Sequence, residues 1–156
     1  MHRPLSNPLV FKYIPWFQQS LVGLIFLGAG ALASAQTVLI TEEESRFPNA
    51  QVLSTRAITR GPAIKLVTPT DVSAKSFAMK FDLEARGGSK LDHNSLKVEY
   101  LKQPVVDLTA RFKPGLLGNH LELHQAKVPE GHHAIKVSIK DSEGREGSHV
   151  FQLTAK

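Results

Sequence analysis

Histidines are the residues of this sequence whose types and spacing come closest to metal chemistry. In His120-Leu-Glu-Leu-His124, the side chains of His120, Glu122 and His124 share one face of a strand, because successive side chains alternate between faces. Neighbours on that face are about 6.8 Å apart, so one histidine and Glu122 could share a zinc or copper ion. His132 and His133 point to opposite faces and cannot chelate as a pair. Because such ions need three or four convergent ligands, we expect polar surface histidines and no bound metal or cofactor.

Other kinds of reactive site have little support in the sequence. There is no G-x-S-x-G, H-E-x-x-H or S-x-x-K motif. The chain has no cysteine, which excludes disulfides, thiolate zinc sites and a catalytic thiol. Two acidic stretches, Asp92-His-Asn94 and Asp141-Ser-Glu143, lack the dense oxygen spacing of a calcium loop, so we interpret them as turns. We therefore expect a protein that is not an enzyme.

The first 35 residues have the features of a secretory signal peptide. They hold two basic side chains and no acidic ones, then an apolar run over 21–32, and finally Ala33-Ser-Ala35. This order is typical of a signal that is cleaved after the A-x-A site, here before Gln36. The alternative is a signal that is kept as an anchor, although the apolar run is shorter than the roughly 20 residues that a membrane span needs. We expect a periplasmic or secreted protein.

Removal of this signal changes the composition that matters for function. The whole chain has 156 residues and a net charge of +5, whereas the mature chain of 121 residues keeps 17 basic and 14 acidic side chains, a net charge of +3. These charges are spread along the chain, which is typical of a solvated surface rather than of a nucleic-acid interface. The mature chain has one tyrosine and no tryptophan, so we do not expect an aromatic platform for sugars.

Residues 36–60 form a polar lead-in to the rest of the mature chain. Thr41-Glu-Glu-Glu44 has the form of a capping box and predicts a short helix near 41–47. The extended stretch over 51–60 is expected to have little order. The short helix could dock on the domain or belong to a flexible tether, and both alternatives stay open.

From Gly61 onward the sequence predicts an all-β domain. Apolar and polar residues alternate most clearly in Phe77–Ala85 and His133–Lys140, which is the period of half-buried strands. Asp141-Ser-Glu-Gly144 follows the second of these strands and is expected to form a hairpin turn with Gly144 in the left-handed conformation. Weaker alternation predicts five more strands, over 64–67, 96–101, 105–112, 120–123 and 150–155. Seven short strands predict a single antiparallel β-sandwich.

The same alternation predicts which side chains form the core. They are apolar residues with inward strand parity, namely Ile64, Leu66, Phe77, Met79, Phe81, Leu83, Leu96, Val98, Tyr100, Leu121, Leu123, Ile135, Val137, Ile139, Phe151 and Leu153. Their burial is expected to drive the folding of a small domain without a disulfide.

The end of the chain resembles the last hairpin of bacterial immunoglobulin-like modules. The resemblance lies in Pro129-Glu-Gly-His-His-Ala-Ile-Lys-Val-Ser-Ile-Lys-Asp-Ser-Glu-Gly-Arg145, followed by Gly147 and Val150-Phe-Gln-Leu. Gly61-Pro-Ala-Ile-Lys-Leu-Val-Thr-Pro69 is similar to their first strand. The antibody-type Cys…Trp…Cys pattern is absent, so the likeness is to the bacterial and fibronectin-like branch. The resemblance implies a binding, spacer or assembly role without catalysis.

Periplasmic copper carriers of the same sandwich class provide the alternative function, a copper or zinc carrier that uses surface histidines. They are similar to this chain in size, export and a late hairpin. They usually depend on a histidine at the mature N-terminus and often on methionine-rich segments. Here the predicted terminus is Gln36, and the one mature methionine, Met79, has core parity. These departures put the carrier function in doubt.

A role in protein interaction or in the structure of the cell envelope is the function that these observations favour. An edge strand of a sandwich can pair with a strand of a partner. Residues 102–109 are a candidate edge, because Pro104 cannot lie in a central strand, and the contact residues would be Val105, Asp107 and Thr109. The alternative, which the proline and the nearby lysines favour, is that Pro104 and these lysines protect this edge from pairing. We expect an unidentified envelope protein as partner, no nucleic acid and, after cleavage, no membrane.

Overall fold

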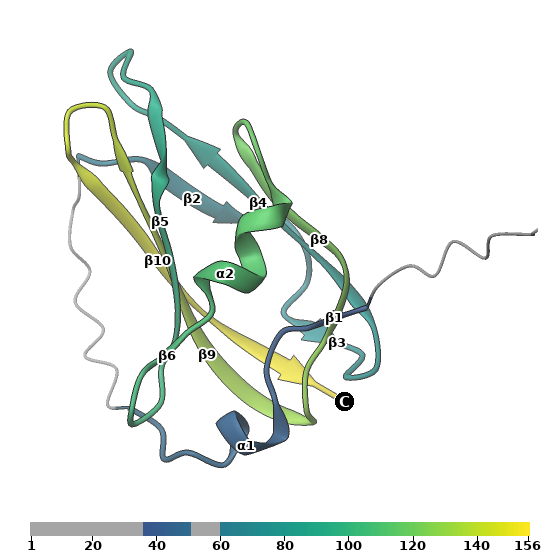
Figure 1. The fold of residues 1–156 in the computed structure, drawn as a ribbon. Helices are drawn as coiled ribbons and strands as arrows, with labels where there is room; N and C mark the ends of the chain where they lie inside the picture. The colour runs from purple at the N-terminus through teal and green to yellow at the C-terminus, as the bar shows by residue number, and fades with distance from the viewer. Residues whose placement is uncertain (1–35, 51–59) are drawn as a thin grey trace, which may run out of the picture. The chain divides into compact units, whose positions relative to one another are not determined.

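The computed structural model describes residues 36–50 and 60–156, and within them the chain forms two β-sheets of five strands each (Figure 1). The strands are β1 (Thr37–Val38), β2 (Ala63–Leu66), β3 (Asp71–Val72), β4 (Phe77–Glu84), β5 (Leu91–Tyr100), β6 (Val106–Asp107), β7 (Leu116–Leu117), β8 (His120–Lys127), β9 (Gly131–Asp141) and β10 (Glu146–Ala155). The helical pieces are α1 (Glu42–Ser45), α2 (Thr109–Phe112) and the 3-10 turn η1 (Lys113–Gly115). None of these helices is long and apolar enough to span a bilayer.

Long strands pair in antiparallel fashion, and short strands complete the sheet edges. The first sheet has the order β1-β8-β4-β2, with β7 also paired to β8, and the second has the order β3-β10-β9-β5-β6. β1 runs parallel to β8, and β3 runs parallel to β10. The chain thus leaves the first sheet after β2, adds β3 to the second sheet and returns to the first with β4.

The apolar sides of the two sheets meet in one core. Phe81 of the first sheet packs on Phe151 of the second, with ring centroids 5.2 Å apart. Fourteen of the sixteen predicted core residues are buried, and the other two, Ile64 and Leu66, are partly buried against them. The strand parity predicted from alternation is therefore confirmed. The alternation did not identify Leu39, Ile40, Leu108, Phe112, Ala74, Ala126, Val128 and Ala155, which are also buried.

The hairpin between β9 and β10 is confirmed, with Gly144 at a φ of 78°. The buried carboxylate of Asp141 organises the turn, since its Oδ1 accepts hydrogen bonds from the backbone N–H groups of Glu143 at 3.0 Å and Arg145 at 2.9 Å. Its Oδ2 accepts from the Arg145 Nε at 2.8 Å and from the Ser89 hydroxyl at 3.2 Å. Burial acts to raise the pKa of Asp141, but these donors outweigh it and lower the pKa below the ordinary value. Asp141 thus caps its own turn, as the interpretation of this stretch as a turn expects.

The strand predicted over Val105–Phe112 is wrong beyond Asp107. Only β6 forms there, because the Asp107 carboxylate accepts a hydrogen bond from the Thr109 backbone N–H at 2.8 Å and starts the short helix α2. The Thr109 hydroxyl in turn accepts from the backbone N–H of Val98 at 3.0 Å. α2 lies between β5 and β8 (Figure 1). Its Phe112 side chain is buried and belongs to the core. Together with the unpredicted short strands β3 and β7, residues 61–156 contain nine strands rather than seven.

Two glycines allow the backbone before β2 to touch the start of β10. A Cβ atom built on Gly147 would lie 1.9 Å from the carbonyl oxygen of Pro62, and one on Gly61 would lie 2.3 Å from the carbonyl oxygen of Glu146. Real side chains do not tolerate such distances. The two sheets therefore meet backbone to backbone at this corner.

Candidate functional site

Residues 36–50, which we call the N-terminal segment, occupy the edge of β8. Thr37 and Val38 pair in parallel with Ala126 and Lys127, and the Leu39 backbone N–H donates to the Lys127 carbonyl at 2.8 Å. Leu39 and the following Ile40 are fully buried in the core. The predicted lead-in thus supplies a strand and two core side chains to the domain.

The helix of the N-terminal segment is α1, shorter than the predicted 41–47, and its capping box is confirmed. The Thr41 hydroxyl accepts from the Glu44 backbone N–H at 3.2 Å, and the Glu44 carboxylate accepts from the Thr41 N–H at 2.9 Å. These bonds satisfy groups that the first turn of a helix leaves free. They also fix Glu44 so that its carboxylate faces α2.

Arg111 of α2 holds the N-terminal segment like a clamp. Its two terminal nitrogens each donate to one Glu44 oxygen at 2.7 Å, and Nη1 also donates to the Leu39 carbonyl at 2.9 Å. Bidentate pairs of this kind are both strong and geometrically selective. The hydrogen bonds from Arg111 lower the pKa of Glu44 to about 2, against the opposing effect of burial.

Replacing Glu44 with glutamine is expected to loosen the N-terminal segment and to lower the free energy of unfolding by about 1–3 kcal/mol, because the charged bidentate pair is lost. The pKa of Glu44 is lower in the folded chain than in the unfolded chain, so the ionised carboxylate stabilises the folded state. This contribution to the free energy of unfolding is fully present above about pH 4.5 and declines as pH falls towards about 2. Urea unfolding at neutral pH and between pH 2 and 4.5 measures both effects. Glu43→Gln is the matched control, because Glu43 is exposed. An equal decrease in the free energy of unfolding in the two variants would contradict a stabilising Arg111–Glu44 pair.

Lys102 makes the second fixed contact with the N-terminal segment. Its ammonium group donates to the carbonyl of Ser45, the last residue of α1, at 2.9 Å, and it lies 5.2 Å from the centre of the Tyr100 ring. Only 6% of Lys102 is exposed, and this burial lowers its pKa. Its backbone also forms a β-bridge with Asn49. The side chain thus joins α1 to the end of β5.

His133 lies behind this contact and is buried, which corrects the expectation of a surface histidine. Its Nε2 lies 2.8 Å from the Pro129 carbonyl oxygen, and its Nδ1 lies 2.8 Å from the Tyr100 hydroxyl. Because a carbonyl can only accept, Nε2 carries the hydrogen, and in the neutral ring Nδ1 accepts from Tyr100. Burial, opposed by the Pro129 bond and reinforced by Lys102 and His132, lowers the pKa of His133. The ring therefore fits this site in its neutral form.

The rest of the β8 edge is covered by β7 and η1. Leu116 and Leu117 of β7 pair with Leu121 and His120. η1 follows the edge so closely that a Cβ on Gly115 would lie 2.1 Å from the Glu122 carbonyl oxygen. Three separate pieces of chain, β7, η1 and β1, therefore cover β8.

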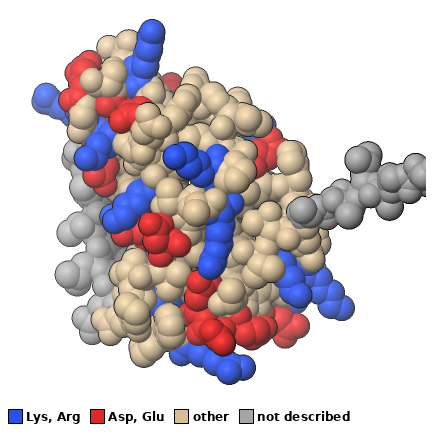
Figure 2. All heavy atoms as spheres, in the orientation of Figure 1, with Lys and Arg blue, Asp and Glu red and all other residues tan. Residues whose placement is uncertain are grey.

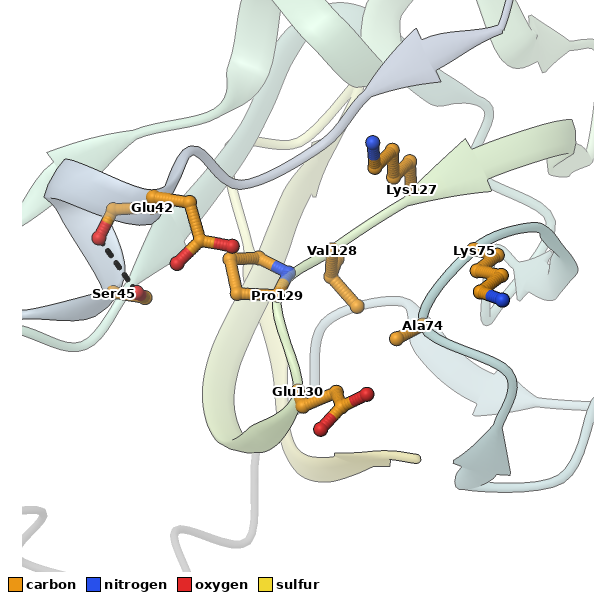
Figure 3. A pocket seen from close by; sticks show the side chains of 8 residues that line it. All are labelled: Glu42, Ser45, Ala74, Lys75, Lys127, Val128, Pro129 and Glu130. Carbon is orange, nitrogen blue, oxygen red and sulfur yellow. Dashed lines mark hydrogen bonds between the residues drawn. The ribbon is translucent and has the colours of Figure 1, made fainter.

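A hollow of about 390 Å³ lies between the N-terminal segment and the end of β8 (Figure 3). Small and apolar side chains, Ala74 and Val128, line its centre, and lysine and glutamate side chains stand around it (Figure 3). The Ser45 hydroxyl donates to the Glu42 carbonyl at 2.7 Å at one side of the hollow. Its lining residues are Glu42, Ser45, Ala74, Lys75, Lys127, Val128, Pro129 and Glu130. Such a mixed rim suits a polar chain segment more than an apolar small molecule.

The histidines considered for metal lie on the outer side of β8. His120 Nδ1 is 2.9 Å from Asp82 Oδ1, and His124 Nδ1 is 3.7 Å from Glu122 Oε1. Within the described part of the chain, no group of three His, Asp or Glu side chains is placed to hold a metal ion. The three candidates are thus divided between two separate pairs.

The predicted partner edge is short in the structure. Val105 is exposed and Asp107 ends β6, but Thr109 belongs to α2, so the three residues do not follow one strand. Of the predicted cleavage site, Ala33 and Ala35 lie outside the described residues. Gln36 is described, and its side-chain amide donates to the Lys75 carbonyl.

Charged side chains of both signs are mixed on the face that Figure 2 shows. On the outer side of the second sheet, Glu99 pairs with Lys97 at 2.6 Å and with Lys136 at 3.7 Å. The hydrogen bond with Glu99 raises the pKa of Lys97. This mixture agrees with the spread of charge along the sequence.

The chain matches no known family model, and no curated protein is significantly similar to it.

Proposed function

We propose that the protein is an exported, non-enzymatic immunoglobulin-like module that binds another protein of the cell envelope. The observation that carries this proposal is the way in which the β8 edge holds the N-terminal segment. Strand pairing, two buried aliphatic side chains and a bidentate Arg111–Glu44 pair hold it in the manner of a bound peptide. Addition of a chain to a sheet edge is a common mode of protein recognition.

The strand order supports the immunoglobulin-like part of the proposal. In that fold, strands A, B, E and D form one sheet and strands C, F and G the other. β2, β4 and β8 fit A, B and E, while β5, β9 and β10 fit C, F and G. β3, which follows β2 in the chain and pairs with β10, fits the second half of a strand A that crosses to the other sheet and lies beside strand G.

The position of His133 supports the same assignment. Immunoglobulin-like domains often have a tyrosine near the start of strand F whose hydroxyl bonds to backbone a few residues upstream. His133 lies near the start of β9, and its Nε2 bonds to the carbonyl of Pro129, four residues upstream. A histidine would thus do here what the corner tyrosine does elsewhere.

Export is supported by the place of the predicted cleavage site. Cleavage before Gln36 would leave β1, which begins at Thr37, complete. Mass determination of the N-terminus of the mature protein tests this part directly, with Gln36 as the expected first residue. A protein that retained residues 1–35 would contradict it.

Photo-crosslinking in the cells that make the protein tests the binding role. A photoreactive residue at Val38 of β1, or at Leu117 of β7, is expected to capture a partner, because both side chains are exposed beside the β8 edge. Val67, which follows β2 at the other end of the first sheet, is the matched control, since it is 49% exposed, as Val38 is. The same partner at all three positions, or none at Val38 and Leu117, would contradict the proposed surface.

A further inference from the structure

We propose that the groove on β8 also accepts the N-terminal segment of a second copy of this chain, so that two copies exchange residues 36–50 in a symmetric dimer. The inference rests on the proposed binding role and names a partner for it. Here the groove means the surface that contacts the segment, formed by the edge of β8, Arg111 of α2 and Lys102 after β5.

The N-terminal segment contacts the domain as a ligand would. Its hydrogen bonds to the rest of the domain include those to Lys75, Leu101, Arg111 and Lys127, which lie far from it in sequence. Arg111 and Glu44, for example, are 67 residues apart. Identical contacts form whether the segment comes from the same chain or from another copy.

The groove is also costly to leave empty. Without the segment, the ammonium of buried Lys102 loses the Ser45 carbonyl, and Arg111 loses both Glu44 and the Leu39 carbonyl. The space of Leu39 and Ile40 would open to water. A buried ammonium without an acceptor and exposed apolar surface are both unfavourable, so a groove that has lost its own segment gains by taking an identical one.

Charge complementarity makes the groove selective for this segment. Arg111 requires a carboxylate four residues beyond the buried Ile40, and the capping box orients it. A second copy supplies this pattern without any further requirement. Exchange of an identical element between protomers forms dimers at little cost in contacts.

The connection between the segment and the domain is long enough for exchange. Nine residues, 51–59, join the N-terminal segment to Arg60. The ten chain steps from Ala50 to Arg60 can span up to about 33–36 Å, which is of the order of the diameter of a domain this size. The segment can therefore reach the groove of an adjacent copy.

Charge exchange between two variants of the mature chain, residues 36–156, tests the proposal. In Glu44→Arg the segment meets Arg111 with a like charge, and in Arg111→Glu the groove meets Glu44 with a like charge. Each variant alone is expected to be a monomer whose segment exchanges amide hydrogens rapidly. An equimolar mixture restores both pairs across chains, so light scattering should show a heterodimer of twice the mass, with protected amides in residues 37–50.

Glu43→Arg is the matched control for this mixture. Glu43 is exposed on the same helix and does not contact Arg111, so its variant should form no heterodimer with Arg111→Glu. A Glu44→Arg and Arg111→Glu mixture that stays monomeric with unprotected segments would overturn the exchange.

A disulfide assay tests the proposal with the clamp intact. The chain has no cysteine of its own, and Val38 and Lys127 are register partners. Val38→Cys and Lys127→Cys on separate chains should form a covalent heterodimer under mild oxidation, whereas Val67→Cys with Lys127→Cys should not. Absence of the first heterodimer would overturn the exchange even where the charge variants fail to fold.

The outcome separates the exchange from the binding role. Heterodimers without capture of another protein at Val38 would support the exchange and contradict the binding of a different envelope protein. Capture of another protein at Val38 without heterodimers would support the binding role and overturn the exchange.

Discussion

Replacing Gly147 with alanine is expected to lower the free energy of unfolding by more than about 3 kcal/mol, and it is the most damaging small substitution that we foresee in this domain. The added methyl group would lie 1.9 Å from the carbonyl oxygen of Pro62 and 2.8 Å from its carbonyl carbon. Both atoms belong to backbone, so no side chain can turn aside. The only relief is a separation of β10 from the chain before β2, which would also disturb the core beneath them.

Urea unfolding of residues 36–156 measures this loss. Ser148→Ala is the control, because Ser148 is the next residue of β10 and is exposed. Gly61→Ala adds a Cβ to the same contact from the chain before β2, 2.3 Å from the Glu146 carbonyl oxygen, and should also destabilise the domain strongly. A Gly147→Ala variant as stable as Ser148→Ala would show that the two backbones are not in contact.

Acidification below about pH 6.5 is expected to destabilise the domain through His133. The pKa of His133 is lowered in the folded state, so just below pH 6.5 the ring is protonated in the unfolded chain but stays neutral in the folded chain. Stability therefore rises with pH between the lowered pKa and 6.5, with a slope of up to about 1.4 kcal/mol per pH unit from this one group. Above 6.5 its contribution is constant.

The contacts of His133 explain why protonation of its ring is unfavourable in the folded state. A proton on Nδ1 would face the Tyr100 oxygen, and the Tyr100 hydroxyl would have to turn its own hydrogen away from the ring. The new cation would also lie near the ammonium of Lys102 and near His132, both of which act to lower the pKa. Glu44, which acts on Tyr100, is already engaged by Arg111.

Two variants isolate this effect. His133→Phe should remove the His133 part of the pH slope and cost about 2–4 kcal/mol at neutral pH, because the Tyr100 hydroxyl and the Pro129 carbonyl lose their partner. His124→Gln, at a histidine whose side chain is 77% exposed, should leave the slope unchanged. Denaturant unfolding across pH 5 to 8 makes the comparison. A slope that survives in His133→Phe would assign the effect to another group.

Local periodicity accounts for most of what could be predicted of the fold. Phe77, Phe81 and Leu83 could be placed in the core because a strand that is buried on one side must alternate. The same rule holds for His133, which shares the inward parity of Ile135 and Val137. Its position in the strand therefore indicates burial, whereas the polar character of a histidine side chain indicates exposure.

The site was less accessible to prediction because its contacts are not local. Leu39 and Ile40 follow one another without alternation, so nothing in their spacing marks them as core residues of β1 and its continuation. Glu44 was identified as part of a capping box, which is a local motif. Its pairing with Arg111 depends on how α2 folds over β8, and α2 itself was predicted as a strand.

The N-terminal segment is synthesised first but can pack only after β8 has been synthesised. Its strand partners, Ala126 and Lys127, are made 76 residues after Ala50, which at ribosomal speeds is a delay of roughly 4–15 seconds. During that time Leu39 and Ile40 have no core to enter. These two apolar side chains are thus exposed until β8 has been made, and their later burial marks the closure of the core.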